Sequence, residues 1–118
     1  MDESVPIFIR IARQLEGEIL DGSLPEEHQV PSINELAAFH RINPATALKG
    51  VTMLVDAGVL YKRRGIGMFV TAGARARLLA QRREAFQASA VRPLVFEATA
   101  LGFTPTELHA MVREEMGQ

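Results

Sequence analysis

The chain has 118 residues, 47% of them hydrophobic and 23% charged, so it has room for one ordinary globular domain or a small domain with a helical appendage, and disorder is excluded. The absence of cysteine excludes disulfides and thiolate metal sites. Neither the short acidic start nor any apolar run is typical of a signal peptide or a membrane span, so we expect a cytoplasmic protein. The formal net charge is −1, but positive charges gather between residues 34 and 67, and this local excess matters more for binding than the total.

The first half of the chain begins with an amphipathic helix. Apolar residues recur every four positions from Ile7 to Ile19, which predicts a helix over about residues 6–20. Residues 24–30 then indicate a loop, with a short strand expected at Val30.

Two further helices, separated by a tight turn, are predicted next. Ser32 and Glu35 form a capping box, in which each side chain satisfies a backbone donor of the other, and this second helix should end near residue 41. Asn43 is a good N-cap and Pro44 a good first helical residue. A third helix should therefore begin there and end at Gly58, which is suited to a C-cap.

A basic hairpin follows the third helix. Residues 59–62 and 68–71 are predicted as short strands, joined by Arg64-Gly65-Ile66-Gly67, in which the glycines allow positive φ. Helix, turn, helix and hairpin is the order of a winged helix-turn-helix, so the predicted fold is mostly α with a small β-hairpin wing. We place this DNA-binding domain at residues 1–72.

Residues 73–118 are predicted to form a short helical region. A helix over residues 74–91, a bend or new start at Pro93, and a last helix opened by the capping box of Thr104 and Glu107 are expected. The apolar side chains exceed what isolated helices can bury, which predicts a homodimer, with packing on the chain's own first helix as the alternative. The residues assigned to dimerisation are Leu78, Leu79, Phe86, Leu94, Phe96, Leu101, Leu108, Met111 and Val112.

The predicted DNA contacts lie on three surfaces. Small or hydrogen-bonding residues at the start of the third helix suit the major groove. Ser32 and the start of the second helix can donate backbone N–H groups to a phosphate, and the basic hairpin suits the backbone or the minor groove. The caps alone would fit an ordinary helical domain, and the hairpin alone a solvated edge; their combination favours double-stranded DNA. The residues assigned to DNA binding are Ser32, Asn34, Arg41, Asn43, Ala45, Thr46, Lys49, Arg63, Arg64, Gly65, Ile66 and Gly67.

Catalysis is not expected. His28, His40 and His109 lack the spacing of metal ligands, Glu114-Glu115 is a solvated end, and no nucleophile motif is present, so we predict neither an enzyme nor a cofactor. A small apolar effector between the C-terminal helices of two subunits is a further expectation, with a fully packed dimer core as the alternative.

Several motifs together resemble the DNA-binding domain of the GntR family of bacterial transcription regulators. They are Pro31-Ser32-x-x-Glu35-Leu36-Ala37, residues 43–46 and Arg64-Gly65-x-Gly67-x-Phe69-Val70, which follow the family's order and spacing over about residues 5–71. The short tail is similar to that of the YtrA-type subfamily. The resemblance implies a homodimeric repressor that occupies an inverted-repeat operator. The alternatives are a regulator with no ligand and a winged-helix module that binds proteins without sequence-specific DNA binding.

Overall fold

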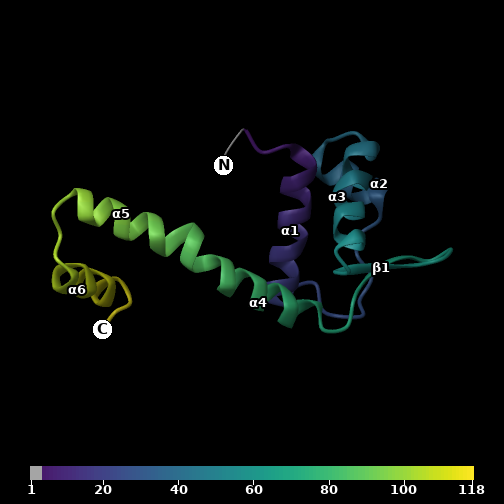
Figure 1. The fold of residues 1–118 in the computed structure, drawn as a ribbon. Helices are drawn as coiled ribbons and strands as arrows, with labels where there is room; N and C mark the ends of the chain where they lie inside the picture. The colour runs from purple at the N-terminus through teal and green to yellow at the C-terminus, as the bar shows by residue number, and fades with distance from the viewer. Residues whose placement is uncertain (1–3) are drawn as a thin grey trace. The chain divides into compact units, whose positions relative to one another are not determined.

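The computed structural model describes residues 4–118 and divides them into two compact units, the first ending at Leu79 and the second beginning at Ala80. The elements, in the chain order that Figure 1 follows by colour, are α1 (Ile7–Asp21), α2 (Ile33–His40), α3 (Pro44–Asp56), β1 (Leu60–Arg63), β2 (Gly67–Val70), α4 (Ala74–Phe86), a π-helical turn η1 (Gln87–Val91), α5 (Arg92–Ala100) and α6 (Pro105–Glu115). The prediction of a mostly helical chain with one antiparallel hairpin is confirmed.

Local signals account for most of the helix boundaries. Both predicted capping boxes are present: Ser32 and Glu35 exchange hydrogen bonds at the start of α2, and Thr104 and Glu107 do so at the start of α6. Asn43 caps α3, as expected. β1 begins and ends one residue later than predicted, and β2 begins and ends one residue earlier, because Arg63 still pairs with Gly67 across the turn.

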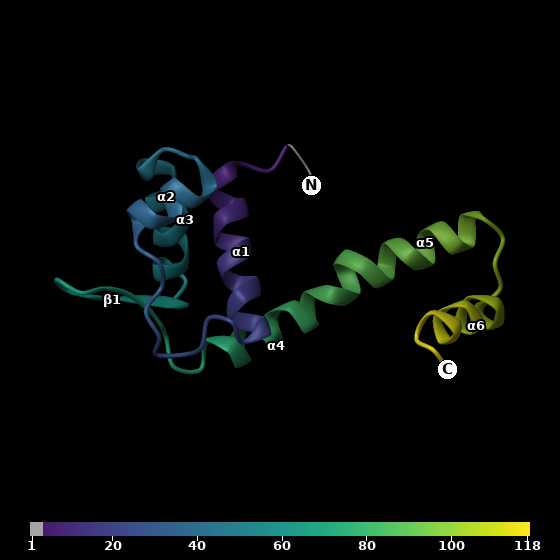
Figure 2. The same ribbon diagram turned by 180° about the vertical axis from the view of Figure 1, so that it is seen from behind.

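The core of the first unit lies between α1 and α3, which run side by side, with α2 across one end (Figures 1 and 2). The predicted stripe of α1 is buried at Ile11, Leu15 and Ile19, and it meets Val51 and Leu54 of α3 in the same cluster. Burial of these aliphatic side chains is the main favourable contribution to folding.

The start of α4 belongs to this core, which moves the division of the chain from the predicted 72/73 to 79/80. Ala74 and Leu78 are 0% and 2% exposed within the core cluster. Leu78 was assigned to dimerisation; instead its side chain fills the first unit and is not available to a second subunit. The guanidinium of Arg77 also donates to the carbonyl of Gly58 (2.6 Å), and Arg75 Nε donates to the carbonyl of Leu20 (2.9 Å).

Gly50 permits the close approach of α3 to α1. A Cβ there would lie 2.7 Å from the carbonyl oxygen of Phe8, which is backbone and cannot swing away. We expect Gly50→Ala to lower the free energy of unfolding by about 1–3 kcal/mol through overpacking. Gly17→Ala, in α1, is the matched control: nothing lies within 4 Å of its Cβ position, so it should raise stability by about 0.5–1 kcal/mol. Urea unfolding of both variants at one protein concentration checks this, and similar changes in both would refute the steric argument.

The wing is a two-stranded sheet with one isolated bridge at its edge. β1 and β2 pair with Leu60 opposite Val70 and Arg63 opposite Gly67. On the other edge of β2, Gln29 forms a bridge with Phe69, supported by the hydrogen bonds from Val30 N to Met68 O (2.8 Å) and from Val70 N to His28 O (3.1 Å). The structure therefore has an isolated bridge at the neighbouring Gln29 in place of the short strand predicted at Val30.

The second unit is helical. Helical structure continues from α4 through η1 into α5 (Figure 2), and the new start predicted at Pro93 is present as the start of α5, which has Pro93 in its first turn. Pro93 has no N–H, and in an α-helix its ring would press on the carbonyl four residues back. The π-helical turn ends just before it, with the N–H of Arg92 bonded to the carbonyl of Gln87, and this wider turn accommodates the proline. No helix among residues 4–118 is long and apolar enough to cross a membrane.

Candidate nucleic-acid interface

The start of α3 presents small side chains to solvent. Asn43 Oδ1 accepts a hydrogen bond from the N–H of Ala45 (2.8 Å), so this oxygen serves the helix cap. Ala45 and Lys49 are exposed, and Thr46 is half-buried. The exposed turn therefore has the small profile that a helix needs to approach base edges in a major groove.

The capping box at the start of α2 occupies the polar groups of Ser32 that were assigned to DNA. The backbone N–H of Ser32 donates to Glu35 Oε1 (3.0 Å), and Glu35 N–H donates to Ser32 Oγ (3.1 Å). The backbone hydrogen bond from Ser32, and after it a bond from the Ser32 side chain, lower the pKa of Glu35, so its carboxylate is charged at neutral pH. The N–H and the hydroxyl of Ser32 are thus both engaged within the capping box, while the neighbouring Asn34 side chain is exposed.

The turn between α2 and α3 is built around Arg41. Its φ is 55°, in the left-handed region that favours glycine, and its N–H bonds to the carbonyls of Ala37 and Ala38.

Lys49, on α3, contacts an aromatic ring of α1: its ammonium lies 4.2 Å from the ring centroid of Phe8. Sequence reasoning missed Phe8, whose role depends on the packing of two separate helices. This contact fixes the direction of the Lys49 charge on the α3 surface.

Arg63 is held against the wing itself. Its guanidinium lies 4.3 Å from the ring centroid of Phe69, donates to the Tyr61 hydroxyl (3.0 Å), and lies 3.7 Å from the Glu27 carboxylate. The Tyr61 hydroxyl in turn donates to Glu27 (2.6 Å). Sequence reasoning did not single out Glu27, since its partners are more than thirty residues away. Arg64, by contrast, stands exposed at the turn beside Gly65.

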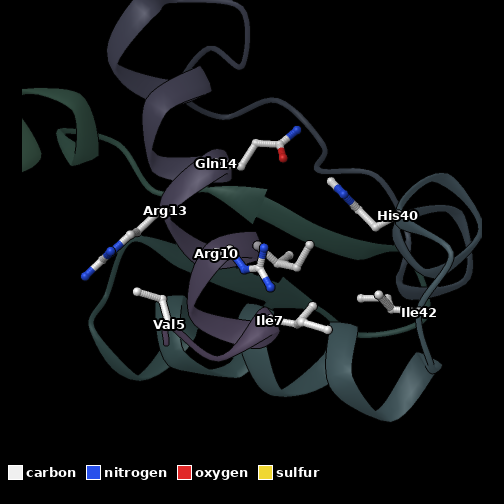
Figure 3. Close-up of a pocket in the computed structure, with 8 residues that line it drawn as sticks. Val5, Ile7, Arg10, Arg13, Gln14, His40 and Ile42 are labelled. Carbon is white, nitrogen blue, oxygen red and sulfur yellow. The ribbon is translucent and has the colours of Figure 1, made fainter. Parts of the chain in front are cut away.

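A second feature of the first unit is a cavity of about 600 Å³ between α1 and the end of α2. In Figure 3 the side chains of Gln14 and His40 point toward each other across it, and Arg13 points away. Its lining residues, which include no acidic side chain, are Val5, Ile7, Arg10, Ile11, Arg13, Gln14, His40 and Ile42. Within residues 4–118 no group of three or more His, Asp or Glu side chains is placed to hold a metal.

Residues 9–70 match the bacterial regulatory proteins of the gntR family over the whole helix-turn-helix and wing. The chain belongs to the gntR family. It is 26% identical over 111 residues to the HTH-type transcriptional repressor YtrA of Bacillus subtilis, covering 94% of this chain and 85% of YtrA. A gntR-family regulator from Bacteroides thetaiotaomicron has a similar structure, with a TM-score of 0.77, 31% identity, and coverage of 94% of this chain and 96% of that one.

The family assignment confirms the winged helix-turn-helix and makes the protein a DNA-binding transcription regulator rather than an enzyme. The gntR-type fold of the first unit also resembles the DNA-binding domain of AraR in complex with the operator ORE1, with a TM-score of 0.55 and 27% identity over 57% of this chain and 82% of that one. The individual DNA contacts assigned from the sequence stay predictions.

Proposed function

We propose that this gntR-family protein is a cytoplasmic repressor that binds an inverted-repeat operator as a homodimer. The observation that carries the dimer is the surface of the second unit, where Ala98 is the one buried residue among residues 80–118. Its exposed large apolar side chains are Phe86, Leu94, Val95, Phe96, Leu101, Phe103, Met111, Val112 and Met116.

Such a surface is unusual for a small helical unit that stands alone. Contiguous exposed apolar patches mark interaction sites, and a second copy of the same helices is the simplest partner for a soluble regulator. Of the residues assigned to dimerisation, Leu108 is half-buried and Leu78 lies in the core of the first unit. The others are exposed and support this proposal. An apolar effector between the subunits stays a prediction.

Two-fold pairing gives the operator its proposed symmetry. A dimer presents two α3 helices, so its half-sites should be inverted and have centres about one helical turn, ~34–36 Å, apart. Repression is supported by the relatives: YtrA and NagR of Bacillus subtilis are both named transcriptional repressors. A dimer bound across a promoter represses by excluding polymerase from it.

Base recognition and phosphate binding should separate on mutation. Asn34→Ala and Thr46→Ala, at the base-reading surface, should lower discrimination between operator and random DNA by about 1–3 kcal/mol where a bidentate contact is lost. Lys49→Ala and Arg64→Ala should weaken binding to all DNA and reduce the slope of log affinity against log salt by about one per lost phosphate contact. Titration of operator and random duplexes at several salt concentrations measures both quantities.

His109→Ala, on α6, is the matched control, because it lies outside the proposed contact surfaces of the first unit. It should bind DNA as the parent does. If all four surface variants also bound operator like the parent, the assignment of α2, α3 and the wing as the contact surface would be wrong. A salt-independent affinity would instead point to a protein partner.

A further inference from the structure

The tip of the wing is fixed by a residue outside the hairpin. Gln29 Nε2 donates to the carbonyl of Ile66 (3.0 Å), and Gln29 is itself anchored by its pairing with Phe69 on β2. Within the turn, the N–H of Ile66 donates to the carbonyl of Arg63 (3.0 Å). Both the N–H and the carbonyl of Ile66 are therefore hydrogen-bonded, which limits the conformations of a turn that contains two glycines.

Gly67 is fitted to this contact. Its φ is 145°, and a Cβ there would lie 2.6 Å from Gln29 Nε2. Any side chain at this position would push the Gln29 amide off the Ile66 carbonyl. The glycine thus serves the approach of Gln29 as well as the backbone conformation.

The residue that this arrangement presents is apolar. Ile66 is 60% exposed at the apex of a hairpin whose other exposed side chains include Lys62 and Arg64. Basic neighbours draw the hairpin toward phosphates, whereas an isoleucine can neither bind phosphate nor hydrogen-bond a base. What an aliphatic side chain can do beside DNA is contact sugars and wedge between base pairs from the minor groove, which is easiest at flexible pyrimidine–purine steps.

We propose that Ile66 acts as an apolar wedge in the minor groove beside each half-site, that Gln29 is the residue that positions it, and that the operator is selected there for a flexible pyrimidine–purine step. This inference rests on the proposed DNA-binding function and adds a site of recognition that depends on DNA deformability rather than on hydrogen bonds to bases.

The test is selection of bound duplexes from a random pool by the full-length parent, Ile66→Ala, Gln29→Met and His28→Ala. Methionine matches glutamine in length but has no donor for the Ile66 carbonyl, and His28 is the exposed neighbour of Gln29. The parent and His28→Ala should select an inverted repeat flanked by TA or CA steps. Ile66→Ala and Gln29→Met should select the same inverted repeat without the flanking preference.

Affinities for two matched operators give the magnitude. Replacing the flexible flanking step by a stiff A-tract should lower the operator affinity of the parent about tenfold, which is the size of effect typical of a change at one base pair of an operator. The same replacement should lower the affinity of Ile66→Ala and of Gln29→Met less than about twofold. Because Gln29 is proposed to act only by positioning the Ile66 side chain, the double variant Ile66→Ala, Gln29→Met should discriminate between the two flanks as Ile66→Ala alone does. Thermal unfolding confirms that each variant is folded.

Three results would overturn the inference: a parent without flank preference, an Ile66→Ala variant that keeps it, or a Gln29→Met variant that keeps it. Failure of the proposed function gives a different result, because then the parent selects no inverted repeat. An equal loss in the salt slope for Ile66→Ala and Arg64→Ala would likewise exclude a wedge and indicate a general loss of wing contact.

Discussion

A chain truncated after Leu79 should be a folded monomer that binds operator about 10²–10⁴-fold more weakly than the full-length protein. The first unit retains its whole hydrophobic core, including Ala74 and Leu78, while the exposed apolar helices of residues 80–118 are removed. Each half-site must then be bound independently, without the high effective concentration that a linked second domain provides. Sedimentation velocity and titration of whole and single half-sites measure the two effects.

Truncation after Gly73 is the matched comparison. It removes Ala74 and Leu78, whose side chains are 0% and 2% exposed, together with the Arg77 contact to Gly58. This shorter chain should unfold at a clearly lower urea concentration than the chain ending at Leu79. A chain ending at Leu79 that stayed dimeric, or that bound the operator undiminished, would contradict the role assigned to the second unit.

Substitutions of two neighbouring leucines of α4 should affect different properties, folding stability for one and self-association for the other. Leu78→Ala should lower the free energy of unfolding of the first unit by about 2–5 kcal/mol, because it empties a core site. Leu79 is 39% exposed, so Leu79→Ala should change that free energy by about 0.5 kcal/mol or less, while weakening self-association as a rim residue of the proposed interface.

Urea unfolding of the truncated monomer separates the two leucines without interference from dimerisation, and concentration-dependent sedimentation of the full-length variants gives their association. Equal destabilisation by both substitutions in the monomer would place Leu79 in the core as well. A dimer weakened by Leu78→Ala but not by Leu79→Ala, with the monomer unchanged, would restore Leu78 to the interface.

The sequence was sufficient where the physical signal is local. A capping box requires two side chains three residues apart, so Ser32 with Glu35 and Thr104 with Glu107 could be assigned directly, as could the cap at Asn43. The winged-helix order depends on a succession of such local signals. This explains why the fold class was predicted correctly from one chain.

Contacts between distant segments could not be predicted in the same way. Nothing near Gly50 indicates that Phe8 O will lie against it, and nothing near Ile66 indicates Gln29. The assignment of Leu78 to dimerisation had the same cause: an apolar residue on a helix shows that it will be covered, but not by which surface.

The candidate site shows this limit in its charges. Arg63 and Arg64 are adjacent and chemically identical in the sequence, yet Arg63, at the end of β1, is stacked on Phe69 beside Glu27, whereas Arg64 lies in the turn. The presence of Glu27 beside Arg63 follows only from the pairing of residues 27–30 with β2.

The π-helical turn at Gln87–Val91 determines the direction in which the side chains after it point, relative to those before it. Each residue of an α-helix advances the side-chain direction by about 100°, and a π-helical turn includes one more residue, so side chains after it lie about 100° from the directions that uniform α-helical counting would give. Phe86 before the turn and Phe96 after it owe their relative bearing to this insertion. A uniform α-helix of the same length would place the later apolar face more than a quarter of a circle away. The wider turn therefore decides which surfaces two copies can bring together, while leaving the winged helix unaltered.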